Sequence, residues 1–318
     1  EIILKYGYNS EIHNIETQDG YIIELHRVRS SPVYGPANPY KLPVLLMHGL
    51  MGSSADWILM GPEESLPYLL SDQGHDVWLG NARGQPQLHY VGHSQGTTMF
   101  FVLNALRPEY NRKFRLMHAL APAVFLTHLQ NPFLRFLAQH ETAALQFVNF
   151  FGIFEVKPYQ EDINRLAKAL CPDFYSRALC LDAMHTMTGN KYHHMSQLGF
   201  PMLLRHLPAG CSLKQVAHFG QAVTSGHFRP YDYGAEENRR RYTGSAVPPD
   251  YDLTKVTAPV VIFYGLADQL THPTDVRQLA GRLPNLVALN QLPNATFNHM
   301  DFLLAGDAKD ALYDSIIG

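Results

Sequence analysis

Several features are scarce in this chain, and each absence excludes a class of protein. Its 318 residues include three cysteines, an odd number that rules out complete disulfide pairing. No apolar run is long enough to span a bilayer, so we expect no transmembrane segment. Basic residues do not exceed acidic ones, at 25 against 28, so nothing indicates a nucleic-acid partner. The 17 histidines lack metal-ligand spacing, and we expect neither a metal site nor a cofactor.

What the chain does contain is an ordinary globular composition, with 46% hydrophobic and 17% charged residues. Its length suits one large domain or two smaller ones. Cys171 and Cys180 bracket a short segment and can pair if the compartment is oxidising, whereas free thiols would suit a cytosolic protein. Asn294 opens a glycosylation sequon, Asn-Ala-Thr, which has meaning only in a secretory protein.

Short apolar runs alternate with helical patterns, which predicts an α/β fold with a mostly parallel sheet. Residues 11–16 and 21–28 flank a turn signal and predict a hairpin at the edge of the sheet. The runs that we expect to be strands are residues 43–47, 76–79, 88–91, 114–120, 259–264 and 286–292, and those at 43–47, 76–79 and 259–264 should be buried.

Residues 123–228 differ in texture from the rest, being rich in Leu, Phe, His and Met without strand alternation. We interpret them as a helical cap or lid inserted between two parts of an α/β core, residues 1–122 and 229–318. The alternative is a helical half of one continuous core. After this segment, residues 231–252 are expected to be rich in turns. The cap phenylalanines, which either face lipid or fill the cap core, are Phe133, Phe136, Phe147, Phe150, Phe151 and Phe154.

The stretch 88–98, LHYVGHSQGTT, reads as a strand, a sharp turn and a helix, with Ser94 at the turn. This is the setting of a nucleophile elbow, in which glycines two residues on either side avoid collisions with the neighbouring strand and helix. A chance G-x-S-x-G occurs in roughly one protein in ten, so the pattern alone is weak. The strand before it and the helix after it favour a catalytic serine.

A serine hydroxyl needs a histidine base, and the base needs a carboxylate that orients it. In α/β-hydrolases these follow the serine in the order acid, then histidine. Asp268 comes after the strand at 259–264 and His299 after the last strand, so we predict a triad of Ser94, Asp268 and His299. The alternatives are a turn-capping aspartate and a packed histidine. Asp275 is a rival acid, but its position at a helix start suggests a cap.

Two backbone N–H groups should stabilise the oxyanion of the tetrahedral intermediate. The residue after the nucleophile is Gln95, at the start of a helix, and the second donor should follow the third strand, where Leu50 lies in a His-Gly-Leu segment. The alternative for that segment is a simple turn.

Five separated motifs, LLMHGLMGSSADW, DVWLGNARG, LHYVGHSQGTT, YGLADQLTHPTDV and NHMDF, resemble those of the acid lipases, which include lysosomal, gastric and insect digestive enzymes. The resemblance implies an α/β-hydrolase core with a helical cap and lid, and secretion or lysosomal targeting. It also implies hydrolysis of triacylglycerols or cholesteryl esters at an oil–water or micelle interface. The match places the triad on Ser94, Asp268 and His299, the oxyanion donors on Leu50 and Gln95, and a disulfide on Cys171 and Cys180.

One departure stands out, because only eight residues, 80–87, join two strands that we expect to be parallel. Such a return normally takes a dozen or more residues, usually including a helix. The acid lipases carry several tens of residues where this chain runs directly from Arg83 through Gly84 to Gln85. Either the protein itself lacks the crossover helix, or the protein has the helix and this sequence leaves that segment out. From the triad and the resemblance, our leading prediction is a lipid-ester hydrolase. One alternative is an esterase of small soluble esters. The other, if the protein truly lacks the helix, is an inert lipid-binding protein.

Overall fold

The computed structural model describes residues 2–16, 22–50, 52–80, 87–140, 155–156 and 210–317. Three sequence predictions fall outside these ranges: the Cys171–Cys180 pairing, the fused link at residues 81–86, and the side chains of all the cap phenylalanines except Phe136.

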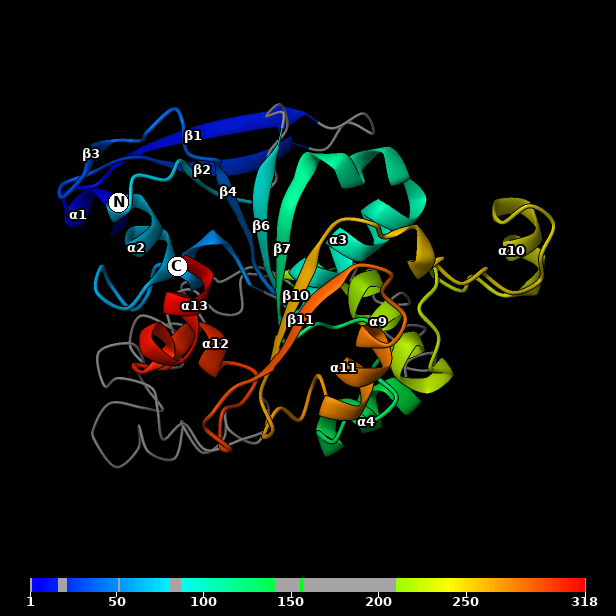
Figure 1. Ribbon diagram of the computed structural model, residues 1–318. Helices are drawn as coiled ribbons and strands as arrows, with labels where there is room; N and C mark the ends of the chain where they lie inside the picture. The colour runs from blue at the N-terminus through cyan, green and yellow to red at the C-terminus, as the bar shows by residue number, and fades with distance from the viewer. Residues whose placement is uncertain are drawn as a thin grey trace.

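The described residues form a nine-stranded sheet, drawn at the centre of Figure 1. Strands β1 (Asn9–Glu16) and β2 (Ile22–Ser31) form the predicted hairpin, and β5 (Val77–Leu79) pairs with β2 in the antiparallel sense. From β5 onward every neighbouring pair is parallel. The strands in their order across the sheet are β1 (Asn9–Glu16), β2 (Ile22–Ser31), β5 (Val77–Leu79), β4 (Val44–Met47), β6 (Leu88–His93), β7 (Phe114–Leu120), β10 (Val260–Tyr264) and β11 (Leu286–Gln291), with β3 (Gly35–Pro36) paired to β2.

All of the predicted apolar runs form strands, and β11 differs from the rest in having no fully buried residue. Every residue of β4 and of β10 is buried, as expected for central parallel strands covered on both faces. Strands β5 and β6 lie on either side of β4, and both run parallel to it.

Helices cover both faces of the sheet (Figure 1). The α-helices are α1 (Ile2–Lys5), α2 (Leu66–Asp72), α3 (Gln95–Leu106), α4 (Pro132–Gln139), α9 (Leu213–Ser225), α10 (Ala235–Arg241), α11 (Pro273–Ala280), α12 (Asp301–Leu304) and α13 (Asp314–Ile317). The shorter helical turns are η1 (Ser54–Trp57), η2 (Pro108–Lys113), η3 (Leu253–Lys255) and η4 (Lys309–Tyr313).

Alternate side chains of β4 enter two separate hydrophobic cores. Val44 and Leu46 pack with residues of α2, α12 and η4, whereas Leu45 and Met47 pack with residues of α3 and α11. The sheet is thus held from both sides, and the carboxyl ends of β6 and β10 are fixed at one edge.

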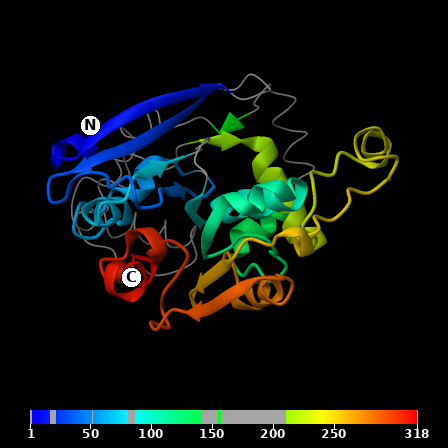
Figure 2. The same ribbon diagram turned by 45° about the horizontal axis from the view of Figure 1, so that its top comes forward.

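Two segments differ from the sequence prediction. Residues 231–252 were expected to be turn-rich, but they contain α10, which stands apart from the body of the molecule in Figures 1 and 2. Ion pairs one turn apart, Glu236–Arg240 and Glu237–Arg241, support this helix. Within residues 123–228, where no strand was expected, α4 and α9 contact each other, and a two-residue strand pair, β8 (Glu155–Val156) with β9 (Cys211–Ser212), is also present.

Candidate active site

Ser94 lies between β6 and α3 in a strained conformation. Its φ of 53° and ψ of −116° are rare for a residue with a side chain. The side chain is 8% exposed, and the backbone N–H donates to the carbonyl of Leu120 at 3.0 Å, which ties the turn to β7. The strand, the sharp turn and the helix are those that the sequence predicted.

The two glycines beside Ser94 are required by close backbone approach. A Cβ atom at Gly96 would lie 2.5 Å from the carbonyl oxygen of Met47 in β4. One at Gly92 would lie 2.8 Å from the carbonyl carbon of Gly96. Real Cβ contacts are longer than this, so either side chain would push the helix away from the sheet.

Asp268 and His299 meet in a buried hydrogen bond. The Nδ1–H of His299 donates to Oδ2 of Asp268 at 2.8 Å, with the two residues 4% and 1% exposed. Asp268 also accepts from the Thr271 hydroxyl at 2.7 Å and from the backbone N–H groups of Leu270 and Thr271 at 2.8 Å. Burial by itself would raise the pKa of Asp268, but His299 and the Thr271 donors outweigh it and hold that pKa below its usual value.

The loop that carries His299 is shaped by its neighbours. Asn298 donates its backbone N–H to Asp301 at 2.8 Å, and its side-chain oxygen accepts from the N–H of Met300 at 2.9 Å. These bonds fix the backbone on both sides of the imidazole.

His93 links the serine to the base, because it directly precedes Ser94 in the chain and its ring packs against that of His299. The His93 ring lies 4.8 Å from the His299 ring, centre to centre, and bonds to the His299 carbonyl oxygen. Among the residues that the structure describes, no hydrogen bond joins the Ser94 hydroxyl to the imidazole. A serine–base contact is often loose without substrate.

Of the two predicted oxyanion donors, one follows Ser94 directly and the other follows a glycine that lies close to Ser94. Gln95 is the first residue of α3, where a backbone N–H has no partner within the helix. Leu50 follows Gly49, at which a Cβ would come within 3.2 Å of the Ser94 Cβ. Neither N–H donates to any residue in the described ranges, so both are available for an oxyanion.

The loop after Leu50 is held by features that the sequence reading missed. Gly52 donates its N–H to the Gly49 carbonyl at 3.2 Å, and Asp56 accepts from the N–H of Ser53 at 3.2 Å. Burial raises the pKa of Asp56 to about 7. Ser53 followed three residues later by Asp56 is a capping-box signal that could have revealed this role.

The rival acid, Asp275, is committed elsewhere. It lies in the first turn of α11, but its carboxylate binds His128, at 2.7 Å to the ring Nδ1 and 2.8 Å to the backbone N–H. Its carboxylate thus joins α11 to the segment that leads into α4, instead of capping the helix as expected.

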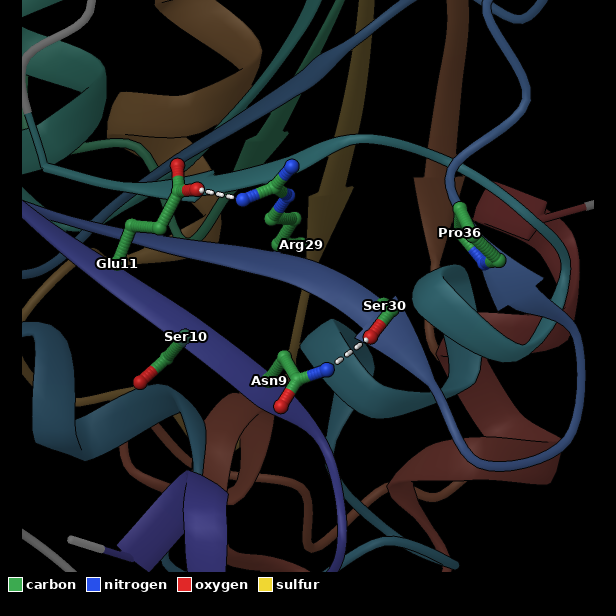
Figure 3. Close-up of a pocket in the computed structure, with 6 residues that line it drawn as sticks. All are labelled: Asn9, Ser10, Glu11, Arg29, Ser30 and Pro36. Carbon is green, nitrogen blue, oxygen red and sulfur yellow. Dashed lines mark hydrogen bonds and ion pairs between the residues drawn. The ribbon is translucent and has the colours of Figure 1, made fainter.

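Within the described residues, no group of three or more His, Cys, Asp or Glu side chains could hold a metal ion. A hollow of about 460 Å³ is lined by residues of β1, β2 and β3 (Figure 3). Its polar groups pair with one another, Arg29 with Glu11 and Asn9 with Ser30, and it includes none of the predicted site residues.

Three further observations concern the predicted modification sites and the membrane. Asn294 is half-buried, with its side-chain oxygen accepting from Thr296 at 2.7 Å. Cys211 is a free thiol. None of the helices in the described ranges is both long and apolar enough to cross a bilayer.

Comparisons with known proteins point the same way as the geometry. A family model described as a partial α/β-hydrolase lipase region matches residues 1–61. Lipase 1 of Drosophila melanogaster is 36% identical over 357 aligned positions, covering 98% of this chain and 77% of that protein. Gastric triacylglycerol lipase of Homo sapiens is 30% identical, covering 100% of this chain and 89% of that protein. A soluble variant of monoglyceride lipase from Saccharomyces cerevisiae has the same fold, with a TM-score of 0.56 at 14% identity over 98% of this chain and 94% of its own.

Proposed function

Because the chain belongs to the acid lipase family of α/β-hydrolases, we propose that it hydrolyses the carboxylic esters of lipids through an acyl-enzyme on Ser94. The observation that carries this proposal is the buried 2.8 Å bond between His299 and Asp268, beside a strained serine at a helix N-terminus. A base oriented by a carboxylate next to a serine is what acyl transfer requires.

The reaction would begin when the Ser94 hydroxyl attacks the ester carbonyl and His299 Nε2 takes its proton. Asp268 keeps Nδ1 protonated and stabilises the imidazolium that forms. The N–H groups of Leu50 and Gln95 receive the negative charge on the carbonyl oxygen. His299 then protonates the departing alcohol, which leaves an acyl group on Ser94. Water, activated by the same imidazole, releases the fatty acid.

The relatives suggest the substrate and the compartment. One of them is named a gastric triacylglycerol lipase, and we propose triacylglycerols or cholesteryl esters at an oil–water or micelle interface as substrates. We also propose that the protein is secreted or targeted to lysosomes. In the oxidising secretory pathway, Cys171 and Cys180 would form a disulfide and Asn294 could be glycosylated. Phe136, which is 57% exposed on α4, would contribute to the lipid-facing side of a cap formed by residues 123–228.

The experiment compares hydrolysis of an emulsified triacylglycerol with that of a short ester in true solution. A lipase should show a rate that rises steeply once the substrate exceeds its solubility, and Ser94→Ala should abolish the reaction on both substrates. An enzyme that prefers the dissolved ester would be an esterase of small soluble esters.

A second candidate, an inert lipid-binding protein, is favoured by one observation. The alignment to Lipase 1 spans 357 positions, more than the 318 residues of this chain, so that relative contains residues with no counterpart here. If the missing residues belong to the crossover at Arg83–Gln85 and support the serine, activity would be lost. A folded chain that binds lipid but does not cleave either ester would establish this alternative.

A further inference from the structure

His93, the residue before Ser94, is buried and makes contacts that the catalytic scheme does not use. It is 2% exposed, at the end of β6. Its Nε2 lies 2.9 Å from the backbone carbonyl oxygen of His299. Since a carbonyl oxygen only accepts hydrogen bonds, Nε2 must carry the proton, and Nδ1 of the neutral ring is an acceptor.

The same ring contacts the three segments that form the site. It precedes the nucleophile directly, and its centre lies 4.8 Å from that of the His299 ring at an interplanar angle of 44°. Its other nitrogen faces the oxyanion loop, since a Cβ at Gly49 would lie 3.2 Å from Nδ1. A shift of this one ring would therefore displace the serine, the base and the loop that carries Leu50.

We propose that His93 is a positioning residue, which sets the His299 imidazole at its working distance from the Ser94 hydroxyl through the bond to the His299 carbonyl and the packing of the two rings. The inference rests on the proposed function, because it concerns the same reaction.

Packing alone does not explain a histidine at this position. Nδ1 is buried and has no hydrogen-bond partner among the described residues. An unpaired buried nitrogen destabilises the folded state, so an apolar ring of similar size would be the better core residue. What a phenylalanine cannot supply is the Nε2–H that holds the His299 backbone.

Burial also keeps this ring neutral. It lowers the pKa of His93 to about 3, and the neighbouring His299 acts in the same direction. A second proton would have to enter at Nδ1, where the described residues offer no acceptor. His93 therefore adds no positive charge beside the imidazolium that forms on His299 during the reaction.

Two matched variants separate the hydrogen bond from the ring. His93→Phe keeps an aromatic ring without the donor, whereas His93→Gln keeps an amide donor of similar reach without the ring. Hydrolysis of a soluble ester would be measured against pH, with rates divided by the number of sites that a fluorophosphonate labels. Unfolding temperature would be recorded in parallel, and Ser94→Ala defines the background.

We expect His93→Phe to lower kcat about 10²-fold with KM changed less than twofold, and to shift the pH at which the base titrates, because a misplacement of about 1 Å has this effect. His93→Gln should recover at least a tenth of the wild-type kcat. A His93→Phe protein that unfolds earlier yet has the wild-type kcat and pH profile per labelled site would show a structural role only and overturn the proposal. If His93→Phe does not fold, a folded His93→Gln with kcat at the Ser94→Ala level overturns it equally. A wild-type chain that neither labels nor hydrolyses would instead contradict the proposed function, and the inference with it.

Discussion

Asp56 and Asp268 are buried carboxyl groups near the two ends of the predicted site, and their partners differ. Asp268 has His299 and three donors, and its pKa is lowered. Asp56 has one backbone donor for Oδ2, while its Oδ1 has no partner in the described part of the chain, and burial raises its pKa to about 7. The same chemical group is therefore ionised at Asp268, beside His299, and protonated below neutral pH at Asp56, in the loop after Leu50.

For Asp56 we predict a stability that falls as pH rises. The pKa of an unfolded aspartate is about 4, so between pH 4 and about 7 the folded state holds a proton that the unfolded state has released. The free energy of unfolding should then decrease with pH by at most about 1.4 kcal/mol per unit from this group. Asp56→Asn keeps an acceptor for Ser53 and should remove this slope in urea titrations across the range.

The control is Asp310→Asn, whose side chain is 86% exposed and should leave the profile unchanged. Identical pH slopes for Asp56→Asn and the wild type would mean that Asp56 does not titrate in this window.

The assignment of the triad acid gives a second prediction at the residue scale. Asp268→Asn should lower kcat about 10⁴-fold, the size expected when an orienting carboxylate becomes an amide. Asp275→Asn should leave kcat within a few-fold of wild type but cost about 1 kcal/mol of stability, because it weakens two part-buried bonds to His128. Kinetics and urea unfolding of the two variants test this. The reverse pattern would make Asp275 the acid.

At the scale of elements, the site depends on how closely α3 approaches β4. Gly96→Ala places a carbon 2.5 Å from the Met47 carbonyl oxygen, so α3 must move and carry Ser94 with it. We predict a loss of about 2 kcal/mol or more in unfolding free energy and a slower reaction of Ser94 with a fluorophosphonate.

The matched control is Gly281→Ala, at the end of α11. Its φ is −70°, and its nearest contact would be 3.6 Å, so it should be neutral or stabilise by up to about 1 kcal/mol. Equal effects of the two substitutions would show that the approach of α3 to β4 is unimportant.

Elements that bury apolar runs could be predicted from the sequence, because the period and length of such runs depend on local residues alone. Residues 43–47 and 259–264 are examples, and both form central strands. The chain order serine, acid, histidine also predicted that Asp268 and His299 meet, since parallel strands end at one edge. The helix α10 was missed because Gly, Pro and Tyr surround it, and the ion pairs that support it appear only once a helix is assumed.

Contacts between residues far apart in the chain could not be predicted from the sequence. His93 meets the His299 carbonyl across 206 positions, and Asp275 meets His128 across 147. No local pattern encodes either pairing. Thr271, three residues after Asp268, is the exception, because a hydroxyl at that spacing is a common partner of an aspartate in a turn.

At the scale of the whole molecule, the oxidation state of the three cysteines indicates the cellular compartment in which the protein folds. A secreted or lysosomal chain should carry a Cys171–Cys180 disulfide, with Cys211 left free. Alkylation under denaturing, non-reducing conditions should then modify Cys211 only, as seen by peptide mass spectrometry, and all three after reduction. Three modified cysteines without reduction would indicate a reducing compartment.

The most direct test of the account is the reaction of the purified chain with a fluorophosphonate ester, followed by peptide mass mapping. A serine activated by His299 and Asp268 should be modified at Ser94 alone and within minutes, while Asp268→Asn should react far more slowly and Ser94→Ala not at all. A folded wild-type chain that stays unmodified at Ser94, or that is modified at another serine, would contradict it.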